Sequence, residues 1–436
     1  MSWENKHVFR VGTEEQYDVS DPDSNIDAQK KHIEPWLSAV FQSEHLGLLL
    51  GSGFTTAVAY QAGTSATGME CDYSNFPYEN ELKAAATKSA KSMGRGEANI
   101  EDQIRAANLL AQGLEIIGNE KSSEVKTALS NLFKGFLNGI SETERNIKQA
   151  VEQIKEGAEP EQEASEDKLD ALVMLVSFLL SFSSRTATRE RLNIFTTNYD
   201  RLIEYGADLA GLHLIDRFVG YLEPIFRSSR LDIDMHYNPP GIRGEPRYLE
   251  GVVRLTKLHG SLDWVYRNDF VRKVGLPFGP QNDHPAFNDN PSESVMIYPN
   301  SAKDRETSAY PYVELFRDYA AAVCRPNSVL VTYGYGFGDD HINRTIADML
   351  TIPSTHLVII SFGDEGGRIS NFCEKVGRKA QISLLIGTHF GHMPTLVENY
   401  LPKPAIDRIT MRQTELLKNR GWDVKAPETN EEDMEK

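Results

Sequence analysis

The sequence predicts an α/β fold, a Rossmann-like parallel sheet with a large helical insertion. Three observations support this prediction. A fully apolar run at 46–50 (LGLLL) ends in a glycine turn, as a strand buried on both faces of a parallel sheet does. From residue 192 onward, apolar strand-like runs alternate with helical segments. Between residues 80 and 190, apolar residues recur mainly at helical spacing.

Residues 1–60 are expected to supply an N-terminal helix, the first strand and a glycine loop. The segment 24–44 places its apolar residues on one helical face, and Pro35 within it predicts a kink or a restart. The candidates for its N-cap are Ser24, Asn25 and Asp27. The strand at 46–50 follows, and GSGFT at 51–55 provides the turn into the next helix.

Residues 61–190 are expected to form the helical insertion. Its apolar run at 171–180 is too short to cross a bilayer and predicts a buried helix, while the acidic segment 156–170 predicts a surface loop. Helical spacing is found in the segments 98–117, 125–140, 144–154 and 169–182. Two roles remain open for this insertion: a surface buried in an oligomer, or an intramolecular cap over the site.

Residues 191–405 are expected to complete the sheet domain. Helices are predicted at 199–211 and 339–350, and the segment 270–310, rich in Pro, Asn and Asp, predicts long loops. Strands are predicted within 192–197, 252–260, 328–337, 356–363 and 381–391. Residues 406–436 are expected to form a C-terminal helix and an acidic tail.

Composition excludes several classes of function. The net charge of −17, from 63 acidic and 46 basic residues, argues against a general nucleic-acid-binding surface, which needs a basic face. Cys71, Cys324 and Cys373 form no CxxC pair and are too few for a four-cysteine zinc site, so no metal is expected. The N-terminus lacks a signal-peptide pattern, and we expect a cytoplasmic protein without membrane association.

Four motifs follow predicted parallel strands, each where its strand ends. They are GSGFT (51–55), TTNYD (196–200), KLHGS (257–261) and GYGFGDD (334–340). The carboxyl ends of parallel strands meet at one edge of a sheet, which is where open α/β sheets bind their ligands. Each motif is weak alone, but the four together predict a site.

The two glycine-rich turns indicate close approach of the backbone to a ligand. Glycines in GSGFT would admit a pyrophosphate, the following helix offers free N–H groups, and Ser52 and Thr55 add hydroxyls. The motif lacks the lysine of a P-loop and the third glycine of GxGxxG, so an ordinary strand-to-helix turn remains the alternative. Gly334, Gly336 and Gly338 suggest the other half of a dinucleotide site, with a flexible loop as the alternative.

Polar side chains at the other two strand ends are candidates for catalysis. Asn198 and Asp200 could cap the following helix, but capping explains only one of them. Asp200 is expected inside the start of that helix, which leaves Asn198 to face a ligand. His259 lies where the chain must turn, and imidazole suits proton transfer near neutral pH, although a lone histidine is more often structural.

Further polar residues have less certain roles. Asp339 and Asp340 are expected to cap the helix that follows them, whereas His341 is expected either in that cap or in the site. His389 and His392 lie near another strand end, and His389 is a candidate for stacking near an adenine.

In this order, the stretches LLLGSGF, TTNYD, KLHGSLDW and YGYGFGDDHIN resemble the sirtuin fold. More closely, they resemble the bacterial sirtuin-like domains of anti-phage defence systems, which carry a similar helical insertion. The resemblance covers roughly residues 33–60 and 190–390. It implies a sirtuin-like NAD-binding domain that hydrolyses NAD+ to nicotinamide and ADP-ribose, and so depletes NAD+ during abortive infection.

The resemblance also implies roles for single residues. Asn198 would lie beside the nicotinamide ribose and position the attacking water, Asp200 would contact the nicotinamide carboxamide, and His259 would be the base at the ribose hydroxyls. Gly51, Ser52, Gly53 and Thr55 would hold the pyrophosphate, Gly334 and Gly336 would line the adenosine ribose pocket, and Phe54 and Thr197 complete the expected cofactor-binding set.

The chain departs from the deacylase pattern of the sirtuins. It has no four-cysteine zinc module, it has Thr197 where deacylases carry glutamine, and residues 71–80 lack the expected arginine. An NAD-dependent protein deacylase and a non-catalytic NAD or ADP-ribose sensor therefore remain the alternatives to an NAD+ hydrolase. The resemblance further implies a homo-oligomer and a HerA-like hexameric ATPase as partner.

Overall fold

The structure is a computed structural model, and it describes residues 7–12, 17–18, 26–92, 97–152, 166–185, 190–229, 233–238, 247–282, 284, 294–296 and 310–403. Several predicted features lie outside the described residues. These are the helix caps proposed at Ser24 and Asn25, most of the acidic segment 156–170, and the C-terminal helix and tail of residues 406–436.

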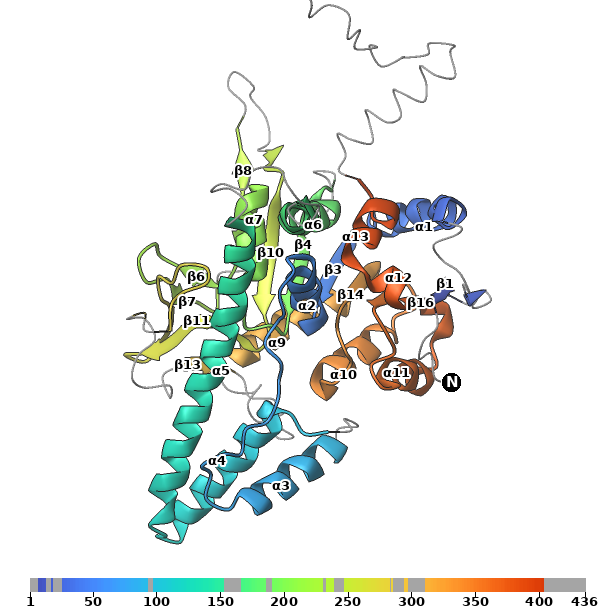
Figure 1. Cartoon of the computed structure of the whole chain (residues 1–436). Helices are drawn as coiled ribbons and strands as arrows, with labels where there is room; N and C mark the ends of the chain where they lie inside the picture. Colours follow the sequence, from blue (N-terminus) through green and yellow to red (C-terminus); the bar gives the residue numbers. More distant parts are fainter. Residues whose placement is uncertain are drawn as a thin grey trace, which may run out of the picture.

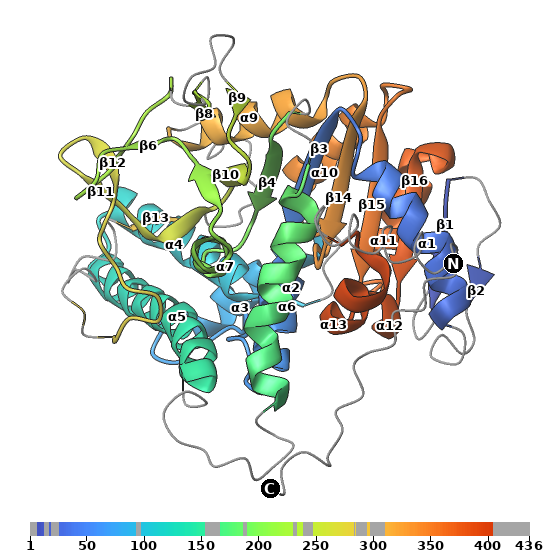
Figure 2. The same cartoon turned by 90° about the horizontal axis from the view of Figure 1, so that it is seen from above.

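A nine-stranded sheet forms the centre of the molecule (Figures 1 and 2). Its strand order is β2-β1-β16-β15-β14-β3-β4-β10-β5, and the seven strands from β16 to β5 are parallel. The strands are β1 (Val8–Arg10), β2 (Tyr17–Asp18), β3 (His45–Leu50), β4 (Leu192–Thr196), β5 (His213–Ile215), β10 (Val252–Lys257), β14 (Ser328–Tyr333), β15 (His356–Ser361) and β16 (Ile382–Ile386). The predicted Rossmann-like α/β fold is confirmed.

Helices cover both faces of this sheet, because its strands are apolar on both sides. Along β3, Leu48 and Leu50 enter one core and Leu49 enters the other, as the period of two requires. The first core is covered by α1 (Ile26–Val40), which runs unbroken through Pro35, and by α2 (Ser52–Gln61), α6 (Glu166–Ser183) and α7 (Leu202–Ala210). The second is covered by α9 (Tyr312–Val323), α10 (Asp340–Met349) and α11 (Arg368–Val376). The short helices α12 (Thr388–Gly391) and α13 (Met393–Thr395) follow β16.

The order of the strands creates a switch point between β3 and β14. From β3 the chain moves outward through β4 and β10, and it later returns to β14 on the opposite side of β3. The connections that leave β3 and β14 therefore diverge and leave a crevice at their carboxyl ends. Open α/β sheets bind ligands at such a point.

The insertion projects beyond the carboxyl edge of the sheet, below it in Figure 1. Its helices α3 (Glu79–Ser92), α4 (Ile100–Ile116) and α5 (Lys121–Glu152) share a small apolar core of their own, which also takes in Tyr199 of the sheet domain. The last helix, α6, packs on the sheet instead, with Leu175 and Phe178 fully buried. The apolar run at 171–180 is thus a buried helix, as predicted.

A second, antiparallel sheet combines two strands that precede β10 with three that follow it. Its strand order is β13-β11-β12-β7-β6, with β6 (Phe218–Val219), β7 (Ile225–Phe226), β11 (Gly260–Arg267), β12 (Phe270–Lys273) and β13 (Ser294–Met296). The strands β8 (His236–Tyr237) and β9 (Arg247–Tyr248) pair separately. The prediction of loops throughout 270–310 is therefore wrong at β12 and β13. Within the described part of the chain, no helix has the length and apolarity needed to cross a membrane.

Candidate active site

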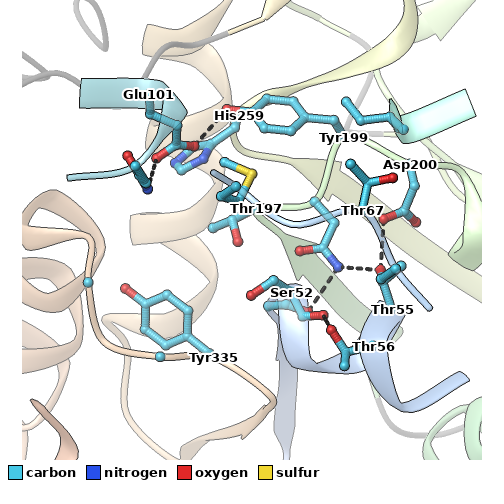
Figure 3. A pocket seen from close by; sticks show the side chains of 18 of the residues that line it. Ser52, Thr55, Thr56, Thr67, Glu101, Thr197, Tyr199, Asp200, His259 and Tyr335 are labelled. Carbon is cyan, nitrogen blue, oxygen red and sulfur yellow. Dashed lines mark hydrogen bonds between the residues drawn. The ribbon is translucent and has the colours of Figure 1, made fainter. Parts of the chain in front are cut away.

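A cavity of about 270 Å³ lies at the carboxyl edge of the sheet, at the ends of β3, β4, β10 and β14. Its size is close to the ~300–1,000 Å³ of small-molecule sites. The structure brings residues of all four motifs to its wall: Gly51, Ser52, Thr55, Thr197, Asn198, Asp200, His259, Gly336 and Asp339. Figure 3 shows the side chains that surround it.

The two glycine turns contact each other directly beside this cavity. The Gly51 N–H donates to the Tyr333 carbonyl at 3.2 Å, and the Gly53 N–H donates to the Gly334 carbonyl at 3.0 Å. Gly334 has a φ of +60°, and a Cβ atom added to it would lie 2.6 Å from the Gly53 carbonyl carbon. These glycines therefore allow the backbone of one turn to pack on the backbone of the other. From the sequence alone, this role could not be distinguished from close approach to a ligand.

Three of the expected cofactor-binding residues do not line the cavity. Gly53 and Gly334 are used in the contact between the turns. Phe54 is fully buried, and its ring lies 5.6 Å from that of Phe178 and 6.4 Å from that of Tyr333. These residues support the first turn from behind, because the inner face of α2 must pack on the sheet.

Asn198 is held by two hydrogen bonds from its amide nitrogen. The nitrogen donates to the Gly51 carbonyl and to the Thr55 hydroxyl oxygen, each at 2.9 Å. Thr55 in turn donates to Asp200 at 2.7 Å (Figure 3). Because both amide hydrogens are used within the protein, the amide oxygen of Asn198 is the atom that a ligand or water can meet.

Asp200 lies before the helix and not inside it. The helix α7 begins at Leu202, whose N–H donates to the Asp200 carboxylate at 3.1 Å. The prediction that Asp200 lies within the helix start was wrong, because the carboxylate caps the backbone two residues ahead instead. The same carboxylate still borders the cavity.

His259 lies between β10 and β11, at the turn that Gly260 makes with a φ of +88°. Its side chain is only 2% exposed, and its Nε2 atom lies 3.4 Å from Nε2 of His341 in the first turn of α10. Such a contact requires one of the two nitrogens to carry the proton and the other to accept it. His341 is therefore a neighbour of the candidate base, although it does not line the cavity.

Two other expectations need correction. Asp339 occupies the N-cap position of α10, but its side chain makes no capping hydrogen bond and borders the cavity. His389 does not line the cavity, and its Nε2 atom lies 2.6 Å from the Tyr400 hydroxyl, which donates to Gln29. His389 is buried, and its ring lies near those of Phe390 and Tyr400 and not at this cavity.

The helical insertion supplies one wall of the cavity, which sequence reasoning did not anticipate in detail. Its contributors are Ala66, Thr67, Met69, Asn99, Glu101, Phe136, Ile140 and Thr143. Glu101 is buried, and its Oε1 atom accepts a hydrogen bond from the Tyr199 hydroxyl at 3.2 Å. Burial and this carboxylate raise the pKa of the Tyr199 phenol well above its ordinary value. Of the two roles left open for the insertion, the geometry supports the cap over the site.

Arg368, the first residue of α11, is the positively charged side chain on the described wall of the cavity. Its Nε atom donates to the Gly336 carbonyl at 2.7 Å, and it approaches Glu365 at 3.4 Å. The sequence could have predicted this position, because GDEGGR (363–368) is a third glycine-rich turn directly after a buried strand. The capping box of Asn99 and Asp102 likewise marks the start of α4, but nothing local places that start at the cavity.

Metal ligands do not gather at this site. Across the residues that the structure describes, no group of three or more His, Cys, Asp or Glu side chains could hold a metal ion. Cys71, Cys324 and Cys373 are free thiols.

A SIR2-like domain model matches residues 192–381. The matched segment carries Asn198, His259 and the turn at Gly334, and it begins after the first glycine turn and the insertion. A search of curated proteins found no significant match to the chain. Together with the parallel sheet, the match is consistent with a sirtuin-like protein and fits an NAD-utilising enzyme.

Proposed function

We propose that the chain is an NAD+ glycohydrolase, which converts NAD+ and water to nicotinamide, ADP-ribose and a proton. The observation that carries this proposal is that Asn198 and His259 line one cavity at the switch point of the sheet. The SIR2-like match over residues 192–381 supports NAD+ as the ligand.

The reaction requires positioning more than it requires a strong acid. The bond between the ribose carbon and the pyridinium nitrogen breaks, and its electron pair neutralises the nitrogen, so nicotinamide leaves without being protonated. The ribose passes through an oxocarbenium-like state, as in other glycosidic cleavages. Water then attacks the same carbon and loses a proton.

The side chains of the cavity suit these tasks. Asn198 is fixed through its amide nitrogen, so its amide oxygen can accept a hydrogen bond from the attacking water. His259 would accept a hydrogen bond from a ribose hydroxyl, and Asp200 would contact the carboxamide. The start of α2 at Ser52 has no side-chain cap, and although the N–H groups of Gly53 and Phe54 donate to backbone carbonyls, the helix dipole favours the pyrophosphate.

Two substitutions test this assignment. Asn198→Ala and His259→Ala are each expected to lower NAD+ hydrolysis by at least about 100-fold, the range typical of removing one positioned catalytic group. Asn371→Ala and His213→Ala remove the same side-chain types at exposed positions and should leave the rate unchanged. Nicotinamide release is measured by chromatography on proteins whose circular dichroism is native. Wild-type rates in either folded cavity variant would disprove the assignment.

The same assay separates the alternatives. Nicotinamide release that depends strictly on an acetylated peptide would indicate a deacylase. Tight binding of NAD+ or ADP-ribose with no cleavage would indicate a sensor.

We also propose, from the sequence resemblance, that NAD+ depletion by this chain serves anti-phage defence and is controlled by a HerA-like hexameric ATPase. Homo-oligomerisation is part of the same proposal. The test compares NAD+ consumption by the purified chain alone and with that ATPase. An identical rate and no complex on size-exclusion chromatography would contradict control by the partner.

A further inference from the structure

We propose that Glu101, which the helical insertion delivers to the cavity, is the anionic group that faces the nicotinamide riboside part of the bound dinucleotide. In this role its carboxylate stabilises the positive charge of the pyridinium and of the ribose as the bond between them breaks. The inference rests on the proposed function, because it assigns a further residue to the same site.

The position of Glu101 is well determined by its neighbours. Its Oε1 atom accepts from the Tyr199 hydroxyl at 3.2 Å, and its Oε2 atom accepts from the Asn99 side chain at 3.4 Å. Glu101 and His259, the residue proposed to hold the ribose, line the same cavity (Figure 3). The side chain is 8% exposed, so a charge placed next to it interacts through little water.

The local structure places Glu101 at the start of a helix. The residue lies in the first turn of the 17-residue helix α4, where the helix dipole stabilises a carboxylate. The capping box of Asn99 and Asp102 fixes this helix start in place. The backbone of the insertion thus holds the carboxylate against the cavity.

The distribution of charge in the cavity fits one orientation of NAD+. Glu101 contacts Tyr199 in the turn after β4, whereas Arg368 contacts Gly336 in the turn after β14. NAD+ has the same separation of charge, because its pyridinium is positive and its pyrophosphate is negative. The dinucleotide would therefore place nicotinamide near Glu101 and phosphate toward Arg368.

Asp200 and Asp339 also border the cavity, but their surroundings assign them differently. Asp200 accepts hydrogen bonds from Thr55 and from the Leu202 N–H, which tie it to the turn that holds Asn198, and its proposed partner is the carboxamide. Asp339 belongs to the N-cap of α10, in the wall formed by the β14 turn. Glu101 is the carboxylate that accepts from the Tyr199 hydroxyl, and the Tyr199 ring centroid lies 6.3 Å from that of His259.

A binding experiment tests the charge of Glu101 without any turnover. NAD+ carries a positive nicotinamide ring and NADH a neutral one, and both are titrated by calorimetry into the full chain with Asn198→Ala. This protein should bind NAD+ more tightly than NADH, and adding Glu101→Gln should reduce that preference about tenfold. Gln keeps an oxygen that can accept from Tyr199. Glu101→Asp should keep most of the preference, and a preference unchanged by Glu101→Gln would overturn the inference.

Kinetics provide the second measurement, with Asn198 intact. Glu101→Gln should lower kcat about 100-fold and change KM much less, because the charge on the ribose develops only as the bond breaks. Glu115→Gln removes an exposed carboxylate from the same helix and should change neither constant. A variant with native kcat would overturn the inference. An inactive wild type that binds NAD+ and shows the charge preference would instead disprove only the proposed hydrolysis.

Discussion

At the scale of single residues, the site depends on a contact that only glycine permits. Gly51 and Gly53 lie against Gly334, and the N–H groups of the first turn donate to carbonyls of the second. A methyl group on Gly334 would lie 2.6 Å from backbone atoms of Gly53 and Phe54. Because Asn198 binds the Gly51 carbonyl, this contact also sets the position of the amide oxygen proposed to hold water.

Gly334→Ala is therefore expected to destabilise the protein and to impair NAD+ hydrolysis. The left-handed backbone costs about 1–3 kcal/mol for a non-glycine residue, and the clash adds to this cost. Gly211→Ala is the matched control, since its φ of +69° is similar but a Cβ there would meet no atom within 4 Å. In urea denaturation, Gly211→Ala should lower the free energy of unfolding by about 1 kcal/mol, and Gly334→Ala should lower it by more. Equal losses in both variants would show that the contact between the turns is unimportant.

The sequence predicted which residues follow a strand, but not which of them face the cavity. Asn198 and His259 were found because polar groups at a buried strand end need partners. Phe54 and Gly334 follow strands equally closely, yet packing turns the first into the core and uses the second for backbone contact. That distinction depends on how α2 packs, which no local pattern records.

At the scale of elements, the insertion is anchored to the sheet domain beside the catalytic motif. Glu144 of α5 is fully buried and binds Arg201 through two side-chain hydrogen bonds, at 2.6 and 3.2 Å. Its carboxylate also accepts the backbone N–H groups of Arg201 and Gly279. Burial acts to lower the pKa of Arg201, but the Glu144 carboxylate raises it, so the guanidinium remains charged.

Glu144→Ala should destabilise the protein by about 3–5 kcal/mol, because it leaves Arg201 buried without this partner. Glu115→Ala breaks the exposed ion pair with Lys126 on the same insertion and should cost at most about 1 kcal/mol. Both values come from urea denaturation at neutral pH. A loss under 1 kcal/mol for Glu144→Ala would mean that the anchor is not needed.

A buried histidine of β15, which contacts β16, predicts that the stability of the protein depends on pH. Burial lowers the pKa of His356 below the ordinary value of 6.5, and its Nε2 atom lies 2.8 Å from the Ser383 hydroxyl. The folded state therefore favours neutral imidazole, and its contribution to stability is present above pH 6.5 and lost as the pH falls through the lowered pKa. His356→Gln should weaken this acid-side loss, whereas His213→Gln should not. Parallel pH curves for wild type and His356→Gln would contradict the prediction.

Elements were predicted where their apolar pattern is strong. The strands β3, β14, β15 and β16 are apolar on both faces, so their existence and their parallel direction, but not their order in the sheet, followed from the sequence. The strands β6 and β7 have two residues each, and because β6 pairs with β7 while β7 pairs with the more distant β12, no local pattern marks them. The position of Glu101 at the cavity could not be predicted either. Helical periodicity shows which face of α4 is apolar, but not which part of the protein that helix packs against.

At the scale of the whole molecule, the fold brings polar side chains from the sheet domain and from the helical insertion to one cavity. The sheet places Asn198 and His259 at its carboxyl edge, and the insertion closes over that edge with Glu101. A site built in this way needs both parts in place. Under the proposed function, movement of the insertion would carry Glu101 away from the cavity and would stop NAD+ hydrolysis without unfolding the sheet.

The most direct test is proton NMR of the purified chain mixed with NAD+, without any acylated peptide. We predict that nicotinamide and ADP-ribose appear in equal amounts with the wild-type chain and that neither appears with His259→Ala. NAD+ that binds the wild-type chain yet stays intact, both alone and with the HerA-like ATPase added, would contradict the proposal that this cavity cleaves NAD+.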